Sequence, residues 1–214
     1  MMKNSFSNSN GAGIVLNIIE QIKANKMYLT DIDGHIGDGD HGINMNKGFS
    51  IAGEIITMQD GFSSAMKALG DTLLLEIGGS MGPIYGTFFR TCAKVTKNVE
   101  DIDAQTFSRM LLQSCREVQE IGGAKPGDKT MIDTLYPAAE TFEKSVEERE
   151  DFKAAISAAS AAAKSGWEST RMMQAKIGRA SRLGERSVGV LDAGATSCNI
   201  ILQAMFSSVL DLLD

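Results

Sequence analysis

The sequence predicts an all-α fold, because apolar residues recur with helical spacing along almost the whole of its 214 residues. About eight segments show this spacing, and no run alternates apolar and polar residues as a half-buried strand does. Aromatic residues make up only 6% of the chain, while alanine and methionine are plentiful, which also favours helices.

The predicted helices can be justified in chain order from their apolar faces. Two of them follow an aspartate suited to capping a helix N-terminus, Asp103 and Asp151, and the last covers residues 197–213. The clearest faces are Ile14, Val15, Ile18, Ile19 and Ile22; Phe62, Ala65, Met66, Leu69 and Leu73; Phe107, Met110, Leu111, Cys115 and Val118; Phe152, Ile156, Ala159 and Ala163; and Ile200, Ile201, Met205 and Val209.

Four stretches interrupt this pattern, and we expect them to be non-helical connections. Pro83 and Pro126 stand beside glycine-rich parts of them. In a bundle whose helices alternate in direction, the connections at one end converge and can form a single site. The longest stretch is interpreted as functional, a lid over that site, since long irregular loops are uncommon in compact domains. The four stretches are residues 27–41, 77–83, 122–129 and 174–194.

Composition and charge limit the class of protein. A chain with 43% hydrophobic and 22% charged residues is typical of a soluble globular protein. We expect one domain over residues 13–214, preceded by a flexible tail over residues 1–12. The net charge of -6, with no dominant basic stripe, argues against a general nucleic-acid binder. No apolar run approaches the roughly 20 residues that a membrane span needs.

The N-terminal residues and the cysteines both indicate the cytoplasm. Residues 1–13 lack the apolar core and cleavage site of a signal peptide. Cys92, Cys115 and Cys198 are odd in number, widely spaced and set in apolar helical patterns. We therefore predict buried thiols in a reducing compartment rather than disulfides, a metal site or a nucleophile.

The stretch "DIDGHIGDGDHGINMNKG", residues 31–48, gathers acidic residues in a glycine-loosened segment. Glycines between Asp33, Asp38 and Asp40 let the backbone fold back so that three carboxylates meet. Such carboxylates repel one another unless cations neutralise them, and their oxygens suit Mg²⁺ or Ca²⁺. An EF-hand is excluded because His35 and Ile36 occupy positions where it needs a ligand and a glycine. A purely structural acidic turn is the alternative.

The two histidines of this stretch are candidate metal ligands or general bases, with ordinary surface residues as the alternative. No Cys/His spacing indicates zinc. His41 opens "HGINMNKG", which reads as a helix start where free N–H groups can face a phosphate. His41 is therefore the stronger candidate of the two, ahead of His35.

Two glycine-rich stretches resemble anion-binding turns. "IGGSMGPIYG", residues 77–86, opens a helix with Pro83 near its first turn, and its glycines permit close approach of a phosphate. An ordinary helix junction is the alternative. "GGAKPGDKT", residues 122–130, has almost the spacing of a P-loop. However, Asp128 intrudes before Lys129, and the preceding residues read as a helix rather than a strand, so we reject the P-loop.

The segment "QAKIGRASRLGERSVGVLDAGATS", residues 174–197, is the one concentrated basic stretch in this acidic chain. Arginine suits multidentate contact with phosphate, and a solvated charged loop is the alternative. Together with carboxylates for a metal and glycine turns for phosphates, this segment indicates a nucleotide site. The basic residues are Lys176, Arg179, Arg182 and Arg186.

Four motifs in this order resemble the L, or nucleotide-binding, subunits of dihydroxyacetone kinases. They are "IGDGDHGINMNKGF", "GGSMGPIYGTFF", "KPGDKTMID" and "GRASRLGERSVGVLDAGATS", and the resemblance extends from about residue 14 to the C-terminus. It implies an eight-helix antiparallel barrel with ADP or ATP bound in the loops at one end.

The resemblance also implies roles for individual residues. Asp33, Asp38 and Asp40 match the family's aspartates, which hold two Mg²⁺ ions that bridge the nucleotide phosphates. The matching nucleotide contacts are His41, Gly42, Ile43 and Asn44 at a helix start; Ser80 and Met81 at the glycine turn; Gly122 and Met131 beside adenine; and Arg179, Asp192, Ala193 and Gly194 in the closing loop.

Two positions depart from the family pattern. The family often has serine where Met81 stands, so a hydroxyl contact to phosphate from this region would have to come from Ser80, the residue next to it. "DAG" at residues 192–194 replaces the commoner "DPG", so the closing loop is expected to be less rigid.

The function implied is that of a phosphotransferase subunit with no catalytic residue on this chain alone. In the family the ketose, dihydroxyacetone or a relative such as erythrulose, is held on a separate K subunit. A phosphocarrier of the phosphotransferase system, fed by phosphoenolpyruvate, rephosphorylates the bound ADP, and we favour this donor over free ATP. A Mg²⁺-dependent phosphohydrolase acting alone and a non-catalytic nucleotide sensor are the alternatives. A homodimer is left open, and no membrane or nucleic-acid partner is expected.

Overall fold

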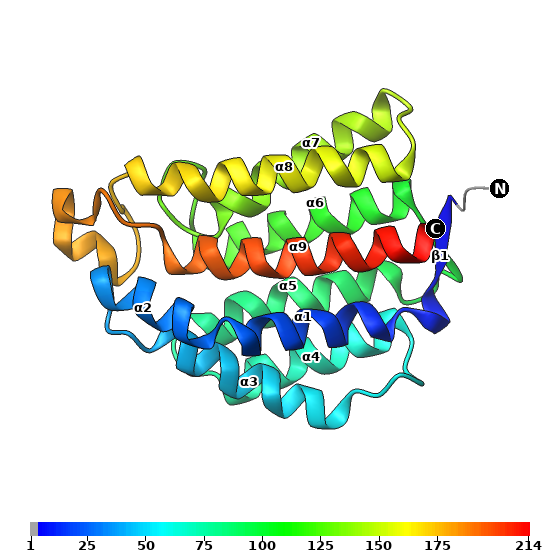
Figure 1. Cartoon of the computed structure of the whole chain (residues 1–214), viewed down its shortest axis with the longest axis horizontal. Helices are drawn as coiled ribbons and strands as arrows, with labels where there is room; N and C mark the ends of the chain where they lie inside the picture. The colour runs from blue at the N-terminus through cyan, green and yellow to red at the C-terminus, as the bar shows by residue number, and fades with distance from the viewer. Residues whose placement is uncertain (1–3) are drawn as a thin grey trace.

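The computed structural model describes residues 4–214 and shows helices running along the long axis of the molecule (Figure 1). Over these residues there are nine α-helices, two short strands and three 3-10 helices. The α-helices are α1 (Ala12–Ala24), α2 (Lys26–Ile36), α3 (His41–Ile55), α4 (Phe62–Glu76), α5 (Met81–Thr96), α6 (Ala104–Gly122), α7 (Ile132–Glu147), α8 (Phe152–Ser169) and α9 (Ala193–Leu213). The remaining elements are β1 (Ser5–Ser7), β2 (Asp101–Asp103), η1 (Asn8–Asn10), η2 (Thr170–Met172) and η3 (Arg179–Ser187).

The all-α prediction is confirmed, but α2 is a helix where the sequence predicted a connection. Leu29, Ile32 and Ile36 are buried at helical spacing, and α2 packs against α3 and α9. Aspartate and glycine, which are poor helix formers, concealed this element in the sequence. The described residues therefore contain nine α-helices rather than about eight, and the true connection is residues 37–40.

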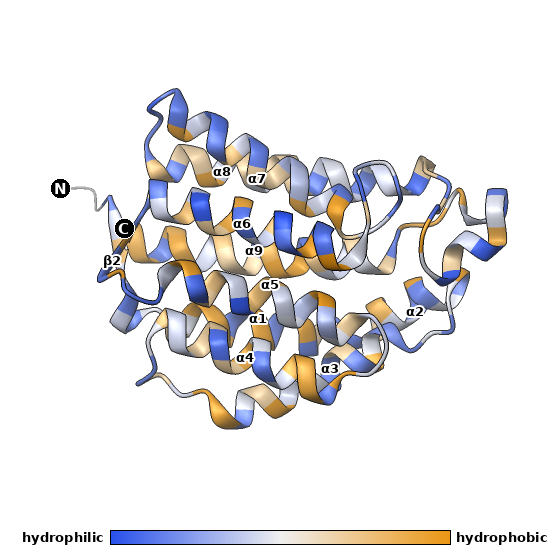
Figure 2. Ribbon diagram, turned by 180° about the vertical axis from the view of Figure 1, so that it is seen from behind, coloured by the Kyte–Doolittle hydropathy of each residue, from blue (hydrophilic) through white to orange (hydrophobic). Residues whose placement is uncertain are grey.

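From α3 onward, successive helices run in opposite directions, which brings alternate connections to the same end of the bundle. The connections 37–40, 77–80, 123–131 and 170–192 lie at one end, on the left in Figure 1, and we call this the site end. Adjacent helices pack in sequence order, as α4 does on α5 and α7 on α8. Figure 2 shows hydrophobic and hydrophilic residues interleaved along the helices, as expected of amphipathic helices around a shared core.

Helix α9 is the longest of the described helices and packs against α1, α7 and α8. It has 21 residues, with a mean hydropathy of 1.3 in its most apolar window, which is long and apolar enough to cross a membrane. The expectation that no segment approaches these properties is therefore wrong for α9. Within the bundle 56% of that window is buried, and the packing of a core helix explains its composition.

The predicted helix caps are present. The carboxylates of Asp103 and Asp151 accept hydrogen bonds from the backbone N–H groups of Thr106, at 2.8 Å, and Ala154, at 2.7 Å. Each satisfies one of the N–H groups that a helix start leaves unpaired. The last helix begins at Ala193, earlier than predicted, because Asp192 caps it in the same way.

Residues 5–12 do not form the predicted flexible tail; residues 1–3 lie outside the described part of the chain. Strand β1 pairs antiparallel with β2, and Phe6 lies opposite Ile102. The Phe6 ring is buried edge-on against Phe62, with 5.5 Å between ring centroids. One apolar residue in a polar stretch gave little sign of this packing.

All three cysteines are free and buried, as predicted. Burial raises the pKa of Cys92 and of Cys115 to about 12, and it also raises the pKa of Cys198. These thiols are therefore protonated and unreactive at neutral pH.

Candidate functional site

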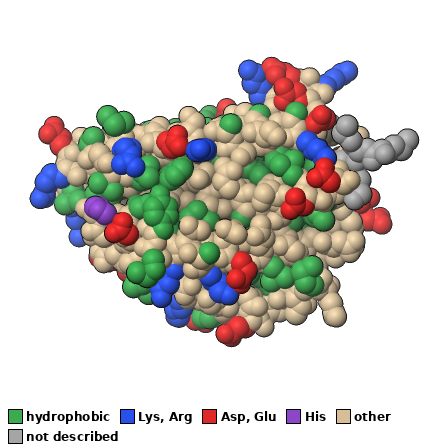
Figure 3. All heavy atoms as spheres, in the orientation of Figure 1, with side chains coloured by type: hydrophobic (Ala, Val, Ile, Leu, Met, Phe, Trp, Pro, Cys, Tyr) green, Lys and Arg blue, Asp and Glu red, His purple; other side chains and the backbone are tan. Residues whose placement is uncertain are grey.

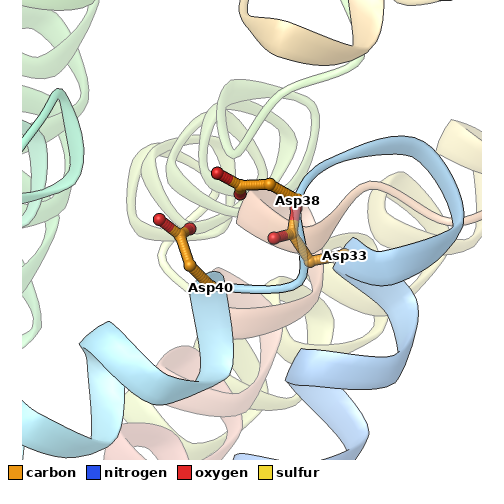
Figure 4. Close-up of side chains that lie close together, drawn as sticks. All are labelled: Asp33, Asp38 and Asp40. Carbon is orange, nitrogen blue, oxygen red and sulfur yellow. The ribbon is translucent and has the colours of Figure 1, made fainter.

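The three aspartates of the acidic stretch converge at the site end. Asp33 lies in the last turn of α2, and the connection 37–40 folds back so that Asp38 and Asp40 face it (Figure 4). Each offers one oxygen, and these oxygens all lie within 4.8 Å of one another. A Cβ on Gly37 would lie 2.9 Å from the Asp33 backbone oxygen and would also press on the Asp33 carboxyl group, so glycine suits this close return.

The charge of this cluster is only partly balanced by the protein. The Arg179 guanidinium pairs with Asp38 and lies 3.7 Å from an oxygen of Asp40. Three carboxylates and one guanidinium leave an excess of negative charge at half-exposed positions. Hard divalent cations with oxygen ligands, such as Mg²⁺, fit this donor set. The Asp40 side chain caps no N–H of α3, so its oxygens are available to a cation.

His41 is buried at the start of α3 and is held by other side chains. Its Nε2 lies 2.8 Å from the Ser197 hydroxyl, which lies 2.6 Å from the Tyr85 hydroxyl. Burial lowers the pKa of His41 to about 4, against the opposing effect of Asp33. The imidazole is therefore neutral at physiological pH, while its backbone N–H donates to Asp33 at 3.2 Å. His35 points elsewhere, with its Nδ1 bonded to the backbone oxygen of Asp31.

The glycine turn between α4 and α5 presents backbone to the same region. Gly79 has a φ of +69°, a conformation that glycine adopts without strain. Ser80 occupies the N-cap position of α5, but no side chain caps the helix. The first N–H groups of α5 are therefore free of side-chain caps and can bind an anion. Pro83 lies in the first turn of α5, as predicted.

The connection 123–131 is not a P-loop, as predicted from the sequence. It follows helix α6, and Gly123 ends that helix with a φ of +68°. Asp133 accepts hydrogen bonds from the backbone N–H groups of Gly127 and Thr130. The Lys129 ammonium binds backbone carbonyls of the 170–192 connection, so all three of its N–H donors are already used.

The long basic connection is more structured than the sequence suggested. Between η2 and α9, residues 179–187 form η3, interrupted at Gly184 by a φ of +57°. We call residues 173–190 the arginine segment, since Arg179 from it reaches the aspartates. Whether this segment acts as a lid stays a prediction.

These elements enclose a cavity of about 720 Å³ at the site end. That volume is in the range of small-molecule sites. Apolar residues such as Ile84, Ile121 and Ile177 line it together with the charged groups. Of the residues singled out in the sequence, the lining includes Asp33, Asp38, Asp40, His41, Asn44, Ser80, Met81, Gly122, Met131, Arg179, Asp192, Ala193 and Gly194.

Two singled-out residues, Gly42 and Ile43, do not line the cavity. Gly42 is buried against α2, and a Cβ there would lie 2.6 Å from the Thr30 backbone nitrogen. Ile43 is 52% exposed and faces solvent. Gly42 therefore has a packing role, and any contact of either residue with a ligand would have to use backbone atoms.

A second cavity, of about 950 Å³, lies along α4 and α5 away from the acidic cluster. Its basic residues are largely paired with acids, since Arg90 and Lys67 both bind Asp71, and Lys94 lies 3.4 Å from Glu117. The smaller cavity is the better candidate because it alone joins the carboxylates, the glycine turn and the arginine segment.

Comparison with known proteins decides the family. A family model described as the DAK2 domain matches residues 35–207. The chain belongs to the DAK2 domain family. It is 42% identical to the ADP-binding subunit DhaL of the PEP-dependent dihydroxyacetone kinase of Escherichia coli, over 83% of this chain and 86% of that one. It is 36% identical to the corresponding DhaL subunit of kinase 2 of Listeria innocua, over 88% and 90%.

Longer relatives contain this DAK2 domain as a part. The chain is 34% identical to the L-erythrulose kinase of Pectobacterium atrosepticum, but spans 33% of that protein. The crystal structure of the native dihydroxyacetone kinase of C. freundii aligns with a TM-score of 0.69 and 23% identity, covering 96% of this chain and 36% of that one. This likeness shows the shared fold. The DAK2 chain matches the DhaL-type subunits over most of their length.

Three side chains in or beside this cavity were not found from the sequence: Tyr85 and Lys129, which line it, and Ser197, which hydrogen-bonds His41 and Tyr85. Tyr85 and Ser197 occupy buried helical positions, where a hydroxyl looks like an ordinary core residue. Lys129 was noted only as part of the rejected P-loop. Their roles depend on partners distant in sequence, which periodicity cannot reveal.

Asp192 should make the stability of this DAK2 domain depend on pH. Its carboxylate accepts a hydrogen bond from Ala195 N–H at 2.7 Å, yet burial raises its pKa from 3.8 to about 7. The folded chain thus keeps a proton that the unfolded chain has lost, and stability falls as pH rises between these values. An Asp192→Asn variant lacks this proton. As the pH rises from about 4 to about 7, its free energy of unfolding should therefore gain about 2 kcal/mol relative to that of the parent, allowing for the partial exposure of Asp192.

Urea unfolding of both proteins at several pH values measures this difference. A difference that stays constant with pH would show that Asp192 does not carry the raised pKa.

Proposed function

We propose that the chain is the nucleotide-binding subunit of a dihydroxyacetone kinase, or of a kinase for a related ketose. It holds Mg²⁺–ADP or Mg²⁺–ATP in the 720 Å³ cavity and passes the phosphoryl group to a ketose on a separate K subunit. The observation that carries the proposal is the meeting of Asp33, Asp38 and Asp40 beside Arg179 in a cavity with a glycine turn.

The donor is proposed to be a phosphocarrier of the phosphotransferase system. The relatives that match this chain over nearly their whole length support this. They are named PEP-dependent in E. coli and Listeria innocua and PTS-dependent in Lactococcus lactis. The erythrulose kinases are about three times as long as the matched region. By this proposal the protein works in the cytoplasm, where such carriers act.

The residues of the chain have distinct tasks in this mechanism. Asp33, Asp38 and Asp40 would hold Mg²⁺, in the family two ions, which neutralise charge on the phosphoryl group when bound. The N-terminus of α5 and its glycine turn orient phosphate oxygens through backbone N–H groups. Arg179, which lies against Asp38 and Asp40, adds a planar cation. The chain thus contributes positioning and electrostatic stabilisation rather than a nucleophile.

The apolar part of the cavity suits the adenine base. Ile84, Ile121 and Met131 come from α5, α6 and the start of α7, on the far side of the glycine turn from α3. Burying a flat aromatic base against such side chains is favourable, and the absence of charged residues among them leaves the phosphates to the acidic half. This division gives the nucleotide one orientation.

The acceptor must reach the phosphoryl group from outside, because in-line transfer needs donor and acceptor in close reach. Exposed apolar side chains surround the site end, and Figure 3 shows hydrophobic and charged side chains interspersed on its surface. Such a surface suits a protein partner that covers the cavity and excludes water. The exposed apolar residues at this end include Ile43, Leu74, Leu75, Ile121, Met172 and Val188.

The proposal can be tested with the purified chain, a K subunit and a phosphocarrier of a DhaL-type kinase. Denatured protein should release adenine nucleotide at close to one per chain, or added Mg²⁺–ADP should raise the melting temperature. The chain alone should phosphorylate no ketose, the K subunit should permit one turnover from bound ATP, and the phosphocarrier should make turnover continuous.

Three outcomes would contradict it. Failure to bind Mg²⁺–ADP would remove the nucleotide site. Hydrolysis of a phosphate ester by the chain alone would indicate a phosphohydrolase. Binding of Mg²⁺–ADP without transfer to any K subunit would indicate a nucleotide sensor.

A further inference from the structure

Lys129 is a buried lysine whose ammonium binds three backbone carbonyls. The residue is 1% exposed. Its Nζ donates to the carbonyl oxygens of Ser187 and Val190 at 2.6 Å each and of Met173 at 3.2 Å. An ammonium has three N–H donors, so all of them are used. No direct ion pair among residues 4–214 includes Lys129; the three carbonyl oxygens bind its ammonium directly, and the nearby Asp192 carboxyl group adds a longer-range attraction.

The three acceptors lie at the two ends of the arginine segment. Met173 is where the segment leaves η2, while Ser187 and Val190 are where it returns toward α9. Two further hydrogen bonds join these ends: Gly189 N–H donates to the carbonyl of Arg171, just before the segment, at 2.7 Å, and Ala175 N–H donates to the Ser187 hydroxyl at 2.9 Å. Between these ends Ile177 packs on the core and η3 contacts α2. The links at the two ends add to these contacts in setting the position of the segment.

The Lys129 side chain is itself held in place by the connection 123–131. The backbone of Lys129 has a φ of +62°, which is unusual for a residue other than glycine. The carboxylate of Asp133 stabilises this turn by accepting from the N–H groups on both sides, those of Gly127 and Thr130. The Asp128 carbonyl also accepts from Lys176 N–H at 3.1 Å, which adds a direct link to the segment.

We propose that Lys129 is a positioning residue, whose ammonium clamps both ends of the arginine segment and so sets Arg179 against Asp38 and Asp40. The clamp acts on nucleotide binding only through Arg179, and this part rests on the proposed function. The clamp itself is a property of the protein without any ligand.

Hydrogen exchange measured by mass spectrometry tests the clamp directly. In a Lys129→Met variant the amides of Ala175, Lys176 and Gly189 should exchange at least about tenfold faster than in the parent, while those of α1 are unchanged. Melting temperature is a poor measure here, since replacing a buried charge by an apolar side chain often leaves global stability intact. Lys125→Met is the matched control, because Lys125 is an exposed lysine of the same connection.

Mg²⁺–ADP affinity tests the action through Arg179. Lys129→Met and Arg179→Gln should each weaken binding about tenfold or more, and the double variant should bind no worse than Arg179→Gln alone. A lysine that only supported the fold would give additive losses. Lys125→Met should bind like the parent.

The outcomes separate this inference from the proposed function. If the parent does not bind Mg²⁺–ADP, the proposed function fails, but the exchange experiment still decides the clamp. Unchanged exchange in the arginine segment of Lys129→Met, uniformly faster exchange over the whole chain, or additive losses would overturn the inference. If Lys129→Met does not fold, Lys129→Gln replaces it. Fast exchange of Ala175 and Gly189 in the parent itself would also overturn the clamp.

Discussion

Replacing Asp38 or Asp40 by asparagine is expected to abolish Mg²⁺-dependent binding of ADP while leaving the helical bundle folded. Both carboxylates lie within 4.8 Å of Asp33 through one oxygen each, and an amide in place of either removes one negative charge and one strong ligand. We expect affinity for Mg²⁺–ADP to fall by at least about 100-fold, or roughly 3 kcal/mol. Titration calorimetry with and without Mg²⁺ measures the loss.

The metal-free stability of these variants, in contrast to their affinity for Mg²⁺–ADP, should not fall. Asp33, Asp38 and Asp40 repel one another, and Arg179 offsets only part of that repulsion. Removing one charge should leave the free energy of unfolding in metal-free buffer unchanged or slightly higher. Asp31→Asn is the control, because Asp31 is exposed on α2 and lies outside the cluster. Equal loss of binding in Asp31→Asn, or normal binding in Asp38→Asn, would refute the ligand assignment.

Gly42→Ala is expected to destabilise the fold and to weaken the metal site together. A Cβ at this position would lie 2.6 Å from the Thr30 backbone nitrogen and closer still to the Lys26 carbonyl oxygen. These are backbone atoms of α2, so α2 and α3 would have to separate. Overpacking of this kind costs about 1–3 kcal/mol. Because α2 carries Asp33, the separation should also weaken Mg²⁺–ADP binding.

Gly34→Ala is the matched control for this substitution. Gly34 lies in α2 as well, but no atom lies within 4 Å of a Cβ built there. Alanine in a helix interior is favoured over glycine by about 0.5–1 kcal/mol, so this variant should be slightly more stable. Urea unfolding gives both values. A Gly42→Ala protein as stable as Gly34→Ala would show that α2 does not pack tightly on α3.

Local signals made most of the fold predictable from the sequence. Asp103 and Asp151 are caps whose partners lie three residues away, so the chain itself contains the evidence. Helix α2 was missed because its apolar residues, Leu29, Ile32 and Ile36, are few and its polar ones resemble a loop. The packing of Phe6 was missed because Phe6 is a single apolar residue in a polar stretch and its partner, Phe62, is remote in the chain.

The candidate site divides in the same way. Asp33, Asp38 and Asp40 are close in sequence, and the glycines between them indicate that the backbone folds back there. The hydrogen bonds that hold His41 and the arginine segment join residues far apart, such as His41 with Ser197 and Lys129 with Val190. Neither pair has a sequence pattern, because tertiary packing alone brings its members together.

The alternation of helix directions has a consequence for how this domain can be joined to other proteins. Strand β1, near the start of the described residues, and Asp214 both lie opposite the site end (Figure 1). A tag or a fused domain attached there leaves the cavity mouth uncovered. A partner tethered to Asp214 must, however, reach back along α9, whose 21 residues span about 30 Å. An extended linker of about ten residues covers that distance. A shorter tether would keep the partner from reaching the cavity mouth at the site end.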